Sequence, residues 1–169
     1  MAYLLALVAT PGADSLAAQL ATEAQRVAVR NDVDVVTLAE LDTLPGYTPD
    51  LDTEDARPLI ANQLRRSALE ADGVLLFADE GTEVPAQAEN VIDWLAHPGS
   101  SPAPAIEGTP VAVITAGPGE VVNQNLADRL RRAGAEVVAD GVSITGSWSD
   151  PATVTRLGDT VVAVASSAS

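Results

Sequence analysis

The fold is decided by one stretch, Tyr3-Leu-Leu-Ala-Leu-Val-Ala9, which runs into Thr10-Pro-Gly-Ala-Asp14 and then into the segment 15–30. The first seven residues form a continuous apolar run, which is typical of a parallel strand covered on both faces. Four apolar residues of the segment 15–30 recur at helical spacing: Leu16, Leu20, Ala24 and Val27. Asp14 or Ser15 is the expected N-cap. The stretch therefore predicts a strand, a turn and a helix.

The same alternation continues along the chain. After the strand at 3–9, further strands are expected at 33–38, 74–78 and 111–115, with two short strands at 136–138 and 142–144. Helices are expected at 15–30, 57–70, 85–95, 121–133 and from 150 onward. Strands that alternate with helices and short turns indicate an α/β fold, in which a doubly wound parallel sheet has five strands in the order 2-1-3-4-5. No second domain is visible, so residues 1–169 are expected to form a single domain.

Composition excludes several classes of protein. Twenty-four acidic and nine basic residues give a net charge of −15, and every basic residue is Arg. Nucleic acid and anionic membrane are poor partners for such a surface, so we expect neither. The absence of cysteine excludes thiolate nucleophiles and thiolate metal sites, and it points to a reducing compartment, the cytoplasm. No apolar run is long enough to span a membrane.

Several catalytic and metal-binding motifs are incomplete in this sequence. The first turn lacks the Gly-Lys-Ser/Thr ending of a nucleotide-binding phosphate loop. Gly117-x-Gly119 follows the fourth strand and lacks a third glycine, so the dinucleotide fingerprint fails. Ser143 has the wrong spacing for a nucleophile elbow, and His97 precedes it in sequence. The acidic run at 50–54 lacks the glycine and the final Glu of a calcium loop. We therefore expect no catalytic side chain and no metal site.

Ligands of open parallel sheets bind outside the carboxyl ends of the strands. Here those ends are the loops 10–15, 79–84 and 116–120, which should form one pocket rim. The first loop opens a helix, whose free N–H groups attract anions. The carboxylates of Asp79 and Glu80 end the third strand; from sequence they either serve the pocket or are simply solvated.

Three local strings resemble the NAD(P)H-dependent FMN reductases, a family with a flavodoxin-like fold. The family's first loop commonly reads G-S-x-R-x-x-S-x-N, and this chain has Ala9-Thr-Pro-Gly-Ala-Asp-Ser-Leu-Ala17. Leu44-Pro-Gly-Tyr-Thr-Pro-Asp-Leu51 is similar to L-P-x-Y-x-x-D-L. The most specific string is Asn90-Val-Ile-Asp-Trp-Leu95, which follows a helix-opening Pro85 as in the family. The resemblance covers nearly the whole chain and implies a three-layer flavodoxin-like fold that binds FMN and uses NADH or NADPH.

The departures from the family pattern fall in the flavin site. The loop's Arg position is Gly12 and its Asn position is Ala17, so the surviving hydroxyls are those of Thr10 and Ser15. The positions that flank the flavin ring are Gly81 and Thr82. The resemblance implies these cofactor-binding residues: Thr10, Gly12, Ser15, Asp79, Glu80, Gly81, Thr82, Gly117 and Gly119.

Two functions follow from this pattern. The first is an NAD(P)H-dependent FMN reductase-like oxidoreductase with weak or absent FMN; the second is a flavodoxin-like protein that has lost flavin and acts as a non-catalytic binding or scaffolding subunit. Because Asp14 brings a like charge to the phosphate loop, we expect the double change Gly12→Arg, Asp14→Gly to tighten FMN binding.

The resemblance also implies a homo-oligomer that associates through the helix at 85–95. Val91 and Trp94 add apolar area there, although Trp94 is either core or interface.

Overall fold

The computed structural model describes residues 1–12, 14–81 and 83–168. The strands are β1 (Ala2–Val8), β2 (Val33–Thr37), β3 (Gly73–Asp79), β4 (Pro110–Ala116) and β5 (Glu136–Ile144). The helices are α1 (Leu16–Val29), α2 (Leu59–Glu70), α3 (Ala86–Ala96), α4 (Val121–Arg132) and α5 (Pro151–Ser167), with short 3-10 turns η1 (Leu41–Thr43) and η2 (Pro49–Leu51).

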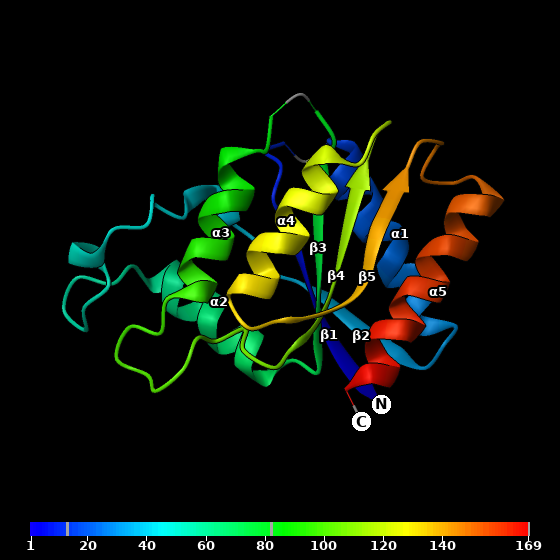
Figure 1. Cartoon of the computed structure of the whole chain (residues 1–169). Coiled ribbons are helices and arrows are strands. Elements are labelled where there is room, and N and C mark those ends of the chain that lie inside the picture. The colour runs from blue at the N-terminus through cyan, green and yellow to red at the C-terminus, as the bar shows by residue number, and fades with distance from the viewer. Residues whose placement is uncertain (13, 82, 169) are drawn as a thin grey trace.

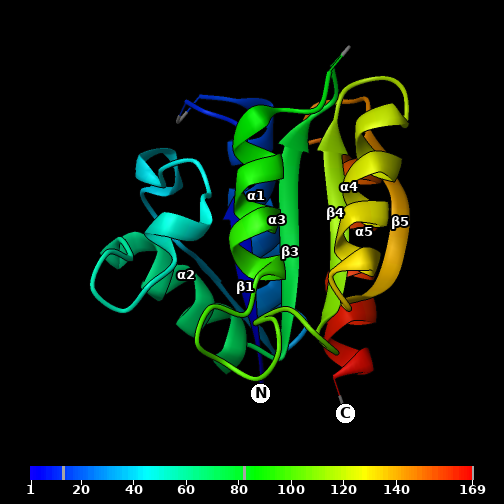
Figure 2. The same ribbon diagram turned by 60° about the vertical axis from the view of Figure 1, so that its left-hand side comes forward.

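The strands form one parallel sheet in the order β2-β1-β3-β4-β5, which confirms the predicted topology. Helices α1 and α5 cover one face of the sheet, and α2, α3 and α4 cover the other (Figures 1 and 2). Consecutive strand residues serve opposite faces: Leu5 and Leu7 pack with α2–α4, while Leu4 and Ala6 pack with α1 and α5. All carboxyl ends of the strands therefore lie at one edge, as the sequence predicts.

Strand β5 differs from the prediction of two short strands. It is one strand of nine residues, with shifts in its register against β4 between Val111 and Ile114. The dipeptide at 140–141 reads as a turn in sequence, but pairing with β4 resumes at Val142. An irregularity of this kind adds residues to one strand without ending it, so the local turn signal is overridden by the neighbouring strand.

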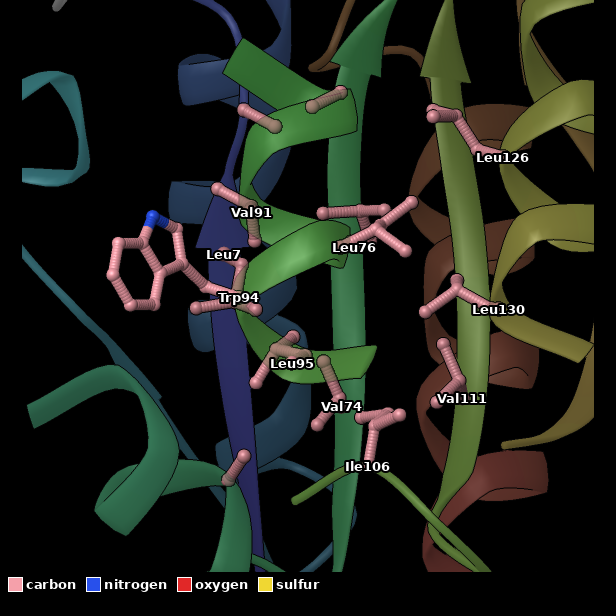
Figure 3. Packing of buried hydrophobic residues seen from close by; sticks show 14 of the residues in the cluster. Leu7, Val74, Leu76, Val91, Trp94, Leu95, Ile106, Val111, Leu126 and Leu130 are labelled. Atoms are coloured by element: carbon pink, nitrogen blue, oxygen red, sulfur yellow. The ribbon is translucent and has the colours of Figure 1, made fainter. Parts of the chain in front are cut away.

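The core is aliphatic apart from two large aromatic side chains, Trp94 and Phe77, and two expectations about burial are corrected. Leu16, predicted to lie on the buried face of α1, is the first residue of the helix and is 48% exposed. Val91 and Trp94 are fully buried, so neither offers apolar area to a second subunit. Figure 3 shows the Trp94 indole directed away from β3, while Val91 and Leu95 face the sheet.

The buried edge of Trp94 fixes the long connection after β2. Its Nε1 donates to the carbonyl of Pro45 at 2.9 Å, and the Asn90 side chain bonds the backbone of Tyr47 and Pro45. The Tyr47 ring meets Trp94 edge to face at 4.8 Å. The two family-like strings, 44–51 and 90–95, therefore contact each other, and their residues bind the connection to α3.

A buried carboxylate completes this attachment. Asp52, whose side chain is 4% exposed, accepts hydrogen bonds from Arg57, Arg65 and the Tyr47 hydroxyl at 2.7–3.0 Å. The Arg65 guanidinium holds the pKa of Asp52 well below its usual range, aided by Arg57 and Tyr47 and opposed by burial. Burial, with the neighbouring Asp52, raises the pKa of Tyr47. Arg65 also donates to the carbonyls of Trp94 and His97, so it joins α2 to the end of α3.

Candidate functional site

The candidate site lies where β1 and β3 end side by side. Asp79, the last residue of β3, donates its backbone N–H to Thr10 Oγ1 at 2.8 Å. Its Oδ1 accepts from the backbone N–H of Ala17 at 3.1 Å, in the first turn of α1. Ser15, the N-cap of α1, accepts from Ala18 N through its hydroxyl at 3.1 Å. Two first-turn donors of this helix are thus already hydrogen-bonded within the chain.

The Glu80 carboxylate likewise accepts hydrogen bonds from the first turn of a helix, which lies on the other face of the sheet. Its Oε1 accepts from Val122 N at 2.9 Å and its Oε2 from Asn123 N at 3.3 Å, in the first turn of α4. The residue at the N-cap position, Glu120, makes no side-chain capping bond of its own. Because successive strand residues point to opposite faces, the dipeptide Asp79-Glu80 caps two helices at once. From sequence, Asp79 and Glu80 either serve the pocket or are solvated. In the structure, each of them accepts a hydrogen bond from the first turn of a helix.

The loop after β4 passes directly over Glu80. Gly117 has φ +127°, and a Cβ there would lie 3.2 Å from both Cβ and the carbonyl oxygen of Glu80. This position therefore requires glycine on two counts, backbone conformation and close approach. A Cβ at Gly119 would lie 3.7 Å from Glu80 Oε1. Gly117 therefore provides the room that Glu80 needs beneath this loop, whereas a Cβ at Gly119 would be in ordinary van der Waals contact with the Glu80 side chain.

A hollow of about 450 Å³ opens beside the first loop, a size within the range of small-molecule sites. Thr10, Pro11 and Gly12 line one side, and the segment 37–42 with Gln87 lines the other. Of the predicted site residues only Thr10 and Gly12 line it. Asp79, Glu80, Gly117 and Gly119 cluster together, Ser15 caps α1, and Gly81 lies beyond the end of β3. Thr82 lies outside the described residues.

The structure decides between the two N-cap candidates of the first loop. Ser15 is the N-cap of α1, and Asp14 is exposed. The acid at the first turn of the helix is instead Asp79, 62 residues from Ala17 in the chain. Gly12 has φ +101°, so an Arg at this position would be strained despite the open space around it. This strain opposes the gain in FMN affinity that is expected from Gly12→Arg.

Sequence reasoning missed one buried polar residue of this edge. Asn123 on α4 is fully buried, and its amide donates to the carbonyls of Val113 on β4 and Val142 on β5. Asn123 lies on the buried face of α4 with Leu126 and Leu130. A polar residue on an otherwise apolar helical face is the sequence pattern from which its buried position could have been predicted. Asn123 fixes the start of α4, and with it the loop that holds Gly117 and Gly119.

The rejected motifs have structural roles. Ser143 Oγ lies 3.1 Å from Thr115 Oγ1, whereas His97 stacks on Tyr47 at 4.1 Å between ring centroids. Asp52 of the acidic run is bound by two Arg side chains. Among the described residues, no group of three or more His, Asp or Glu is arranged to hold a metal ion. No helix in the described part of the chain has the length and apolarity that crossing a bilayer needs.

The fold and the edge at which the loops meet define a flavodoxin-like α/β protein. Residues 2–150 match the family model of NADPH-dependent FMN reductase, and the chain belongs to that family. This confirms the resemblance read from the sequence. No curated protein matches the chain.

Solved structures share the fold at low sequence identity. The flavoenzyme NAD(P)H:(acceptor) oxidoreductase FerB from Paracoccus denitrificans is 22% identical, with a TM-score of 0.75 over 99% of this chain and 97% of that one. Oxidised flavodoxin 2 from Bacillus cereus is 18% identical, with a TM-score of 0.62 over 98% and 99%. An NADH:FMN oxidoreductase in its apo form is 13% identical, with a TM-score of 0.66 over 96% and 87%. Nothing in these comparisons favours a scaffolding role.

The residues present fit the parts of FMN unequally. The loops after β3 and β4 carry glycines at Gly81, Gly117 and Gly119, so no side chain projects from these three positions at the carboxyl edge. The first turn of α1, where a phosphate would bind, instead has the Asp79 carboxylate on Ala17 N. The edge is thus compatible with an aromatic ring and poorly suited to a phosphate dianion.

Proposed function

We propose that this protein is an NAD(P)H-dependent flavin oxidoreductase whose affinity for FMN is weak. Family membership is the observation that carries the activity. The flavin, when bound, accepts hydride from the nicotinamide, so the protein needs no acid or base of its own. The loops 79–82 and 116–120 hold the ring at the carboxyl edge of the sheet, and the β1–α1 loop lies beside the flavin tail.

The weak affinity follows from charge. The loops 10–15, 79–84 and 116–120 contain no Arg, so a flavin phosphate finds no cation in them. A flavin phosphate lies instead beside the half-buried Asp79 carboxylate, which already accepts a hydrogen bond from a backbone N–H in the first turn of α1. The missing charge-assisted bond alone removes about 1.5–3 kcal/mol of binding free energy.

The test is a comparison of flavin content with activity. Visible absorbance and mass spectrometry of the purified protein should show little or no flavin. Added flavin should nevertheless restore NADH or NADPH oxidation, at a rate proportional to protein concentration. Stoichiometric FMN in the purified protein would contradict the weak site, and failure of saturating FMN and riboflavin to support any oxidation would overturn the activity.

Association and location complete the proposal. The resemblance implies a homo-oligomer, which light scattering at micromolar concentration tests; a monomer would contradict it. The absence of cysteine supports the reducing cytoplasm as the site of action.

A further inference from the structure

We infer that Asp79 selects flavin without its phosphate, so that riboflavin binds this protein more tightly than FMN does. The inference rests on the proposed function, since it concerns the same flavin site. It makes Asp79 a specificity-determining residue, and it gives the preferred ligand an uncharged tail.

The Asp79 carboxylate occupies the place where a flavin phosphate would bind. In this sheet order a flavin tail lies at the β1–β3 switch point, and a phosphate uses the first-turn N–H groups of α1. Asp79 Oδ1 already accepts from Ala17 N at 3.1 Å, and Ser15 Oγ accepts from Ala18 N at 3.1 Å. A phosphate must therefore displace the carboxylate or lie beside it.

The backbone of Asp79 is also held in place. Its N–H donates to Thr10 Oγ1 at 2.8 Å, which joins the end of β3 to the β1–α1 loop. Asp79 is half-buried, and Ala17 is fully buried. Partial burial lowers the effective dielectric, so repulsion between this carboxylate and a phosphate is stronger than it is in water.

An uncharged tail meets a favourable partner at the same place. Asp79 Oδ2 has no hydrogen-bond partner among the residues that the structure describes. The terminal hydroxyl of riboflavin is a donor, and a hydroxyl bound to a carboxylate is a charge-assisted hydrogen bond. The group that repels a phosphate is therefore able to bind the alcohol that replaces it.

The experiment is titration of the protein with riboflavin and with FMN, followed by quenching of flavin fluorescence. We expect the Kd of riboflavin to be lower than that of FMN by about tenfold or more at low ionic strength. Asp79→Asn retains an oxygen for Ala17 N but removes the charge, so it should tighten FMN binding by about tenfold while riboflavin changes by less than about threefold. Asp14→Asn, which neutralises an exposed acid of the same loop, is the matched control and should change FMN binding by less than about threefold.

A second measurement needs no variant. Raising the salt concentration from about 0.01 M to about 0.15 M shortens the Debye length from ~30 to ~8 Å, so FMN binding should tighten while riboflavin binding stays constant. Tighter binding of FMN than of riboflavin, or a larger gain from Asp14→Asn than from Asp79→Asn, would overturn the inference and leave the proposed function standing. Binding of neither flavin to the protein or its variants would overturn both.

Discussion

The acid pair at the end of β3 shows how two adjacent side chains can replace local helix caps. A helix leaves its first N–H groups without intrahelical partners, and a nearby Ser, Thr, Asp or Asn usually accepts from one of them. Helix α4 has Glu120 at the N-cap position, whose side chain makes no such bond, so Glu80 supplies both acceptors from a neighbouring loop. The negative charge also favours the positive end of the helix dipole. Stability of α4 is thus linked to β3.

Replacing Glu80 should destabilise the protein even though its side chain is only partly buried. Glu80→Ala removes acceptors from Val122 N and Asn123 N, and we expect a loss of about 1–2 kcal/mol in the free energy of unfolding, the range for a helix cap. Glu80→Gln retains one oxygen and should lose less. Urea denaturation at pH 7 measures the change, with the exposed Glu83→Ala as control. Equal stability of the Ala variants at 80 and 83 would show that Glu80 does not act as a cap.

At the scale of elements, the long connection between β2 and α2 contains only two short 3-10 turns. Side chains from α2 and α3 hold it in place. Asp52 lies at the centre of that attachment, with Arg57 and Arg65 on one carboxylate. Removing one partner from a buried ion pair leaves the remaining charges buried without an opposite charge, which destabilises the folded protein. The position of this connection therefore depends on the negative charge of Asp52.

Asp52→Asn should cost about 3 kcal/mol of unfolding free energy at pH 7, the lower end for breaking a buried pair. The pKa of Asp52 lies well below its ordinary value of 3.8, so folding favours the charged carboxylate. Its contribution is complete above that ordinary value and is lost as the pH falls from it toward the lowered pKa of the folded state. The difference between the unchanged protein and the variant should therefore be large at pH 7 and narrower at about pH 3.

Urea denaturation at both pH values checks this. Asp50→Asn removes an exposed carboxylate two residues away and should change stability by less than about 0.5 kcal/mol. A stability difference for Asp52→Asn that is independent of pH would contradict the assigned ionisation.

These contacts also show what could be read from the sequence. The strand order and all five helices follow from periodicity and turn residues, because a buried parallel strand and an amphipathic helix have local signatures. The capping contacts of Asp79 and Glu80 join residues 62 and about 42 positions apart, and no local pattern encodes such a pairing. The positive φ of Gly12 was not predicted either.

At the scale of the molecule, more than half of the basic residues lie at the amino edge of the sheet, where Asp72, Glu107 and Glu136 also lie. Arg26 and Arg30 end α1, and Arg129, Arg131 and Arg132 end α4, so these five of nine basic residues lie toward the amino edge. The loops of the carboxyl edge carry acids instead: Asp14, Glu40, Asp42, Asp79, Glu80, Glu83 and Glu120. A negatively charged ligand is repelled from this edge.

This asymmetry predicts the choice of nicotinamide cofactor, if the proposed function holds. The 2′-phosphate of NADPH brings additional negative charge to an acidic edge, so NADH should have the lower KM, by about tenfold at low ionic strength. The gap should narrow at about 0.15 M salt. Steady-state kinetics with both cofactors measures it. Arg30, which is exposed and ends α1 at the amino edge, provides the matched variant, Arg30→Gln, which should leave the ratio unchanged. A strong preference for NADPH would contradict this prediction.

The double cap at the end of β3 has a consequence for how this protein can evolve. Asp79→Ala would free Ala17 N for a phosphate but would also remove a hydrogen bond between β3 and α1, so a step toward tighter cofactor retention would cost folding stability. Under selection for FMN capture, we expect the first accepted replacement at this position to be Asn, which retains the bond to Ala17. Replacements that lose the bond should become acceptable only after stabilising mutations elsewhere in the chain.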